Sequence, residues 1–446
     1  MAPLPKWNPL FRGLLTVFIF LGFTRFAHAQ ANAPAAPATA SAQPSSDQVP
    51  QAYTLSPERA AKAVAYARAR RAIYFIDFAW GLLVLVLVLR WRVAVVFRQW
   101  AERASRRRIV QAAVFAPPLL ALVSLASLPV DAVRHRFAVE YGLSVQGWAS
   151  WLLDWGKGTL LGLALCIFLV WLLYAAMRRS PRRWWFYGWL GSLPILVFVV
   201  FLSPWLVDPL FFDFTPLAPA HPELAAQIER VVARAGEDIP ESRMYVINAS
   251  SKENELNAYV TGLGASRRVV VWDTTLARLT APELLSVFSH EMGHYVLGHV
   301  RDGVIFGAAM LLAGLSAGSH LFAWAVRRWG DSWGLRGVDD WASLPVLLII
   351  FSVLGFLVTP AGNAYSRHIE HQADQYGLEV LHGIVPDASA AAARSLQILG
   401  DDDLEEPSPS GAVVFWFYTH PPINDRIVFA NTYHPWAPGQ SPEFVK

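Results

Sequence analysis

Long apolar runs dominate the pattern of the chain and predict helices that cross a membrane. Six of them are long enough to span the roughly 30 Å hydrocarbon core of a bilayer. They lie at about residues 72–89, 109–130, 159–177, 184–206, 303–325 and 343–360. The first four are expected to form an N-terminal membrane part, residues 71–206, with a loop at 131–158. The pattern therefore predicts a multi-pass bundle of membrane helices.

Two further blocks have the pattern of water-soluble protein. Residues 221–240 space apolar side chains as an amphipathic helix does. Thr280 and Glu283 have the spacing of a capping box, which predicts the start of another helix. Short β-branched or alternating stretches at 243–250, 257–262 and 267–273 predict one small sheet. We thus expect a small α+β domain made of residues 207–302 and 361–446, split by the two membrane spans within 303–360.

The chain ends and one loop have compositions that predict no packed core. Residues 1–29 combine a basic start, an apolar centre and Ala27-His28-Ala29, the pattern of a secretory signal peptide. An uncleaved anchor helix is the alternative, against which Arg25 argues. The Ala/Pro/Ser-rich residues 30–70 are predicted to be a linker. Residues 401–411, which are acidic and rich in Pro and Ser, are expected to form a solvated surface loop.

Composition supports a membrane protein and excludes several other classes. With 54% hydrophobic and 16% charged residues and a mean hydropathy of +0.34, the chain is too apolar for an ordinary soluble enzyme. A net charge of +3 is too small to suggest that it binds nucleic acid. Its one cysteine, Cys166, lies in an apolar run, so a disulfide framework and a thiolate metal site are both excluded.

Arginines predict the orientation in the membrane. They cluster after the first, third and fifth spans, at residues 90–108, 178–183 and 327–336. The positive-inside rule places these loops in the cytoplasm and therefore both soluble-type blocks on the other side. A cleaved signal peptide predicts the same arrangement. Together they suit a bacterial inner membrane with the soluble blocks facing the periplasm, and a cytoplasmic-facing site is the alternative.

The candidate chemistry begins at His290-Glu291-Met292-Gly293-His294. Residues four apart lie on one face of a helix, so His290 and His294 can bind one ion together. Zinc suits such ligands because it accepts nitrogen and carboxylate donors and can keep one position open for water. Glu291 is displaced about 100° around the helix. It can therefore reach that water and serve as general base.

A third ligand is expected downstream, within residues 365–377. Glu370 and Asp374 are four apart and share a helix face, so Glu370 could bind the metal while Asp374 orients a ligand histidine. His368 and His371 are competing ligands, offset from that face. His299 is out of register with the ligand face of its own helix.

Several blocks, in order, resemble one family. The chain is similar to the membrane-embedded zinc endopeptidases of the type I CaaX prenyl protease family. The similar blocks are "NAYVTGLGASRRVVVWDTTL", "LLSVFSHEMGHYVLGHV", "SRHIEHQADQYG" and "THPPINDRI", together with the loop "HRFAVEYGLSVQGWASWLLDWGKG". The resemblance implies a mostly α membrane bundle that carries a gluzincin-like metalloprotease domain split by two spans.

The resemblance also implies roles for individual residues. His290, His294 and Glu370 would bind one Zn²⁺ per chain, with Glu291 as the base. His420 would either stabilise the oxyanion or be a plain turn residue. Arg367 and Arg426 would either make structural ion pairs or contact a substrate carboxylate. An edge strand would hold the extended substrate through main-chain hydrogen bonds; its residues are Asn257, Ala258, Tyr259, Val260 and Thr261.

The expected function is zinc-dependent hydrolysis of peptide bonds in a membrane. The polypeptide substrates would be membrane-associated, lipid-modified or misfolded proteins, and the lipid bilayer is the other expected partner. The alternative is a catalytically inactive scaffold or chaperone, although Glu291 and all the expected ligands are present. A transporter is a third possibility, but charged residues within the spans are few, chiefly Asp77. The arginine pattern also differs from prenyl-processing relatives, which act on cytosolic tails.

Overall fold

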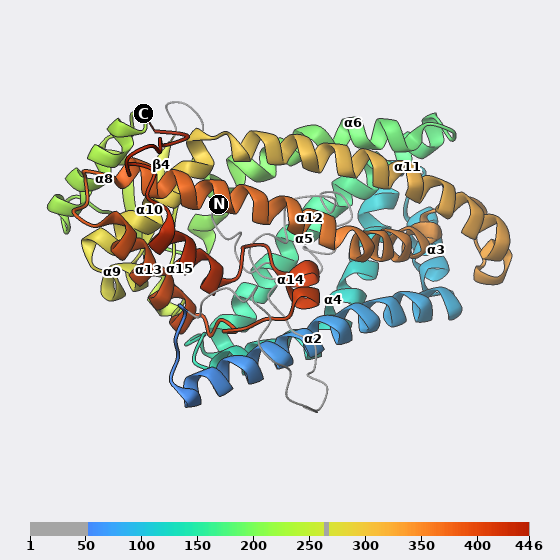
Figure 1. Ribbon diagram of the computed structural model, residues 1–446. Helices are drawn as coiled ribbons and strands as arrows, with labels where there is room; N and C mark the ends of the chain where they lie inside the picture. Colours follow the sequence, from blue (N-terminus) through green and yellow to red (C-terminus); the bar gives the residue numbers. More distant parts are fainter. Residues whose placement is uncertain (1–51, 263–266, 446) are drawn as a thin grey trace.

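The fold is a bundle of long helices with a small sheet-containing part at one end (Figure 1). The computed structural model describes residues 52–262 and 267–445, so the predicted signal peptide lies outside the described residues. Within that part of the chain, six helices are long and apolar enough to cross a membrane. They overlap the six predicted spans and are α2 (Pro57–Arg90), α4 (Arg108–Glu140), α5 (Trp148–Arg179), α6 (Trp184–Val197, continued by a π-helix, Phe198–Leu202), α11 (His299–Trp333) and α12 (Leu344–Leu381).

Shorter helices cover the ends of this bundle. The helix α3 (Val93–Ala104) follows α2 at the arginine-rich end. At the other end, the long helices meet the part of the chain that contains the sheet (Figure 1). Its helices are α7 (Ser203–Leu206), α8 (Pro222–Arg234), α9 (Asp273–Arg278), α10 (Ala281–Val296), α13 (Ala388–Asp402) and α15 (Ile423–Thr432). The short helix α14 (Gly411–Phe417) packs instead on α12 and α2, beside the middle of the bundle (Figure 1).

The predicted linker is too long at its C-terminal end. The helix α2 begins at Pro57, well before residue 70, because Ser56 caps its N-terminus by accepting a hydrogen bond from the Arg59 amide. Proline suits the first helical position, and alanine favours helix over coil. An alanine-rich composition was therefore a poor indicator of disorder between residues 57 and 70.

The acidic stretch at residues 401–411 is also more than a solvated loop. Asp401, at the end of α13, forms an ion pair with Arg59, and Glu406 forms one with the buried Arg71 at 3.4 Å. Both arginines belong to α2, so the acidic residues tie the C-terminal part to the first membrane helix. A pattern of charge alone did not show that these partners would lie within reach.

The sheet has four strands in the order β1 (Phe214–Pro216), β2 (Met244–Ile247), β4 (Arg268–Trp272) and β3 (Ala258–Thr261). The central strands β2 and β4 are parallel, whereas β1 and β3 pair antiparallel to them. One face packs on α8 and α10 through a buried cluster that includes Ile228 and Phe288. Since β3 is at the end of the order, it is an edge strand, as predicted, and among the described residues it pairs only with β4.

The capping box predicted at the start of α10 is present, with Thr280 and Glu283 bonding each other's backbone amides. This helix then lies against α12 along a long contact. Glycines permit the close approach: a Cβ added at Gly377 would meet the His290 amide nitrogen at 3.1 Å, and one added at Gly293 would meet the Ala373 backbone at 3.2 Å. The two helices therefore touch nearly backbone to backbone.

Replacing Gly377 with alanine is expected to lower the free energy of unfolding by about 1–3 kcal/mol, because the added methyl group must push α10 away. The measurement is the thermal unfolding midpoint of the detergent-purified protein. Gly362→Ala, in the same helix, is the matched control, because a Cβ there has nothing within 4 Å. Equal midpoints for the two variants would show that the helix contact tolerates the extra volume.

Candidate active site

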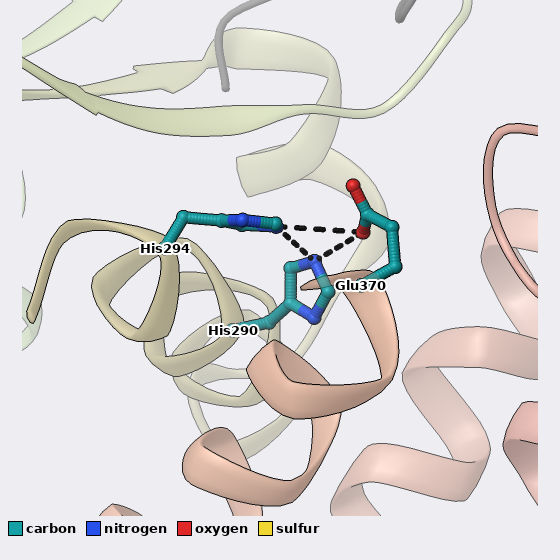
Figure 2. A group of neighbouring side chains, drawn as sticks. All are labelled: His290, His294 and Glu370. Carbon is teal, nitrogen blue, oxygen red and sulfur yellow. Dashed lines mark hydrogen bonds and ion pairs between the residues drawn. The ribbon is translucent and has the colours of Figure 1, made fainter. Parts of the chain in front are cut away.

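The close contact of α10 and α12 brings three predicted ligands together (Figure 2). The Nε2 atoms of His290 and His294 lie 3.2 Å apart, one helical turn from each other on α10. Glu370, on α12, directs Oε2 to 3.1 Å from His290 Nε2 and 3.4 Å from His294 Nε2. Among the described residues, these three form the group of donors that could hold a metal ion.

The environment of the three side chains fits a bound cation. Glu370 Oε2 is buried and has no hydrogen-bond partner in acceptable geometry, although imidazole nitrogens surround it. A buried carboxylate oxygen left in that state is costly unless a cation is close to it. Two imidazoles and one carboxylate are also the donor set typical of catalytic zinc sites. We therefore conclude that the residues present suit a divalent metal.

Asp374 and Arg426 fix the orientation of His290. Asp374 Oδ1 lies 2.8 Å from His290 Nδ1, which assigns a proton to Nδ1 and turns Nε2 toward the cluster. Arg426, on α15, binds both oxygens of Asp374 at 2.7 and 2.8 Å. Arg426 therefore makes the structural ion pair, one of its two predicted roles.

The histidine pKa values show that this cluster favours positive charge. Burial opposes the charged form of His290, but its hydrogen bond with Asp374 and the nearby negative charge of Glu370 raise its pKa to about 9. Burial lowers the pKa of His294, so only one of the two rings is readily charged. A metal ion would take the place of the proton at Nε2 of His290.

His299 orients the second ligand histidine. Its Nδ1 lies 3.1 Å from Nδ1 of His294, and its side chain is buried. The helical register predicted that His299 lies off the ligand face. In the structure, His299 meets the Nδ1 edge of the His294 ring, whereas the Nε2 edge of that ring faces His290. This partnership crosses the junction of α10 and α11, where Gly298 adopts a left-handed conformation that turns the chain. Spacing within one helix could not predict it.

The remaining histidines and Arg367 have different surroundings. His420 Nε2 lies 3.2 Å from Glu370 Oε2, and burial lowers the pKa of His420 to about 4, so its ring is neutral near pH 7. Arg367 donates to the backbone oxygens of Val414 and Tyr418. Arg367 therefore holds the segment before His420 in place. The competing ligand candidates, His368 and His371, are exposed.

The predicted substrate strand lies beside this cluster, since β3 contacts α10. Four of its five residues, Ala258 to Thr261, form the edge strand, and Asn257 precedes it. Asn257 is held by Thr275, whose Oγ1 accepts from the Asn257 amide at 2.7 Å and donates to its carbonyl at 2.8 Å. The edge strand and the metal-type cluster thus both lie against α10, whose C-terminal half also carries Glu291.

Known proteins have sequences similar to that of this chain. Residues 219–433 match peptidase family M48, and residues 41–213 match the CAAX prenyl protease N-terminal region, described as five membrane helices. The uncharacterized metalloprotease YhfN of Bacillus subtilis is 35% identical over 383 residues, covering 86% of this chain and 88% of the relative. The CAAX prenyl protease 1 homolog of Homo sapiens is 25% identical over 390 residues, covering 76% and 77%.

The fold also has a counterpart among solved structures. The crystal structure of S. mikatae Ste24p matches with a TM-score of 0.72, covering 96% of this chain and 98% of that one. The sequence identity is 19%, so this likeness concerns the fold. It agrees with the expected multi-pass helical bundle that carries a small protease part.

Proposed function

Because the chain belongs to peptidase family M48 and is a membrane metalloprotease, we propose that it is a zinc endopeptidase. The observation that carries the proposal is the convergence of His290, His294 and Glu370 around a buried carboxylate oxygen without a hydrogen bond. One zinc ion per chain would supply Lewis acidity for the attack of water on a peptide carbonyl.

The residues around that position have separable roles in the proposal. Glu291 accepts a proton from the attacking water and later gives it to the leaving amine. Asp374 keeps His290 in the tautomer that leaves Nε2 free toward the ion. His420, neutral and adjacent to Glu370, is placed to donate a hydrogen bond to the developing oxyanion. The edge strand, residues 257–261, holds an extended substrate by main-chain hydrogen bonds.

The place of the site supports a choice of substrate. The ligand pair on α10 and the ligand Glu370 on α12 are separated in sequence by the membrane helix α11 and by the apolar part of α12 that precedes Glu370. Long helices therefore wall the site and restrict the approach of bulky, folded domains. We propose that the substrates are membrane-associated, lipid-modified or misfolded polypeptides. The arginine-rich loops support an orientation in a bacterial inner membrane with the site toward the periplasm.

Metal removal tests the proposal. The full chain, purified in detergent, is expected to contain about one zinc ion and to cleave an unfolded casein-type substrate. Dialysis against a chelator should remove both the metal and the activity, and added Zn²⁺ should restore both, because the three ligands lie in a preformed cluster. Activity that persists without metal would refute the zinc mechanism, whereas bound zinc without cleavage would favour the inactive-scaffold alternative.

A further inference from the structure

The loop between α4 and α5 docks beside the chain that leads into the edge strand. Ser144 and Glu253 form an isolated antiparallel β-bridge. On either side of it, the Val145 amide donates to the Lys252 carbonyl at 3.0 Å, and the Asn254 amide donates to the Leu143 carbonyl at 3.1 Å. Residues 143–145 thus pair with residues 252–254 as a short added strand.

Side chains reinforce this pairing. Ser144 Oγ donates to the Lys252 carbonyl at 2.9 Å, and Asn254 Nδ2 donates to the Gly142 carbonyl at 2.8 Å. The Lys252 ammonium group donates to Asp154 Oδ2 at 2.7 Å, which anchors the segment to the first turns of α5. Leu143 is buried with Tyr66 of α2 and Leu404. The loop is therefore held from both sides.

The carbonyls of Glu255 and Asn257, before β3, point toward the start of α9 and the end of β4. The Glu255 carbonyl accepts from Thr274 Oγ1 at 2.7 Å, and the Asn257 carbonyl accepts from the Trp272 amide at 3.0 Å. In an extended chain the main-chain groups of alternate residues point to opposite sides. The main-chain groups of the even-numbered residues therefore point away from β4.

The loop bonds to that outer side. Its partners, the Lys252 carbonyl and the Asn254 amide, belong to even-numbered residues. Ala258 and Val260 are even-numbered as well, and their outward groups form the free edge of β3. Residues 143–145 consequently occupy the same side of this chain segment as another strand would occupy if it paired with β3.

We propose that Leu143–Val145 is a stop that limits how far a bound polypeptide extends past the Asn254 end of the edge strand. This inference rests on the proposed peptidase function and adds a rule for its specificity. Residues 255–257 leave room for about three substrate residues beyond the one opposite Ala258. A longer tail at that end meets a main-chain edge already occupied by the loop, whereas at the Thr261 end no such pairing occurs among the described residues.

Peptides that share one cleavable core and carry tails of increasing length at either end test the proposal. For the wild-type full chain, lengthening the tail that extends past Asn254 should lower kcat/KM roughly tenfold. Lengthening the tail at the opposite end of the peptide should not lower it. Ser144→Ala/Asn254→Ala removes two hydrogen bonds that hold the loop and should reduce this penalty to roughly twofold. Ser150→Ala, which removes only a bond with Gln146 beside the loop, is the matched control and should keep the penalty.

A reversible crosslink provides a second test. Ser144 and Glu253 are directly opposite each other, and the main-chain hydrogen bonds of the bridge join their neighbours rather than the two residues themselves. In antiparallel strands, side chains are closest in pairs of this type. Ser144→Cys/Glu253→Cys should therefore lock the loop when oxidised and keep the full length penalty. Three results would overturn the inference. They are an equal loss of kcat/KM for long tails at both ends, a loss that is unchanged in Ser144→Ala/Asn254→Ala, and rapid cleavage of peptides with long tails by the locked form. Failure of the wild type to cleave any peptide would instead refute the proposed function.

Discussion

Glu291→Gln is expected to lower cleavage of an unfolded substrate by about 10²–10⁴-fold, with the metal content unchanged. The amide keeps the shape of the side chain but cannot accept a proton, so general base catalysis is lost. Glu291 is not one of the three converging donors, so the variant should still bind metal. The measurement is kcat on a casein-type substrate, with zinc determined on the same sample.

Glu223→Gln, on the exposed face of α8, is the control for changing one glutamate elsewhere in the protease part. It should retain wild-type activity and metal. If Glu291→Gln instead loses its zinc, the residue has a structural or ligand role. If it retains full activity, another group must take the proton, and the assignment of the base is wrong.

Glu370→Gln is expected to abolish stoichiometric zinc binding and, with it, cleavage. Glutamine cannot supply the negative charge that the two imidazoles lack, and Glu370 is the only carboxylate in the three-donor cluster of the described chain. A ligand that binds only the folded protein raises its stability by about 4 kcal/mol at a thousandfold excess over Kd. Added Zn²⁺ should therefore raise the thermal midpoint of the wild type and leave that of the variant nearly unchanged.

This shift in midpoint separates metal loss from misfolding. Without metal, Glu370→Gln should still unfold in one cooperative transition, although it loses the favourable charge interaction of Glu370 with His290. Glu229→Gln, exposed on α8, serves as the control and should respond to Zn²⁺ as the wild type does. A zinc-induced shift in Glu370→Gln would show that the metal has another third ligand.

Hydropathy predicted the existence of all six long helices but not their ends. The spans predicted at 72–89 and 343–360 are parts of α2 and α12, which continue for several turns beyond the apolar run. Outside the hydrocarbon region a helix can be polar, so mean hydropathy ceases to mark it. The start of α2 at Pro57 depended on local capping by Ser56, a signal that composition concealed.

The convergence of the three candidate ligands and the Asp374 contact with His290 followed from helical spacing and from the family resemblance. The contacts that crossed between elements did not. His299 reaches His294 only because the chain turns at Gly298, and Arg426 reaches Asp374 from α15, about fifty positions downstream. The ion pairs of Asp401 and Glu406 with α2 likewise depend on tertiary packing. A single sequence has no pattern that encodes such distances.

The helix α12 is both a membrane-crossing segment and the carrier of Glu370. During synthesis, His290 and His294 emerge before α11 and α12, whereas Glu370 emerges after α11 and after the apolar N-terminal part of α12. The donor set is therefore complete only when the pair of helices has folded back through the bilayer to meet α10. A nascent chain that has not yet inserted this pair has not assembled the proposed metal site, so under the proposed mechanism proteolytic activity begins only with correct membrane integration. Biogenesis itself would thus protect the cell from the enzyme before the enzyme reaches its site of action.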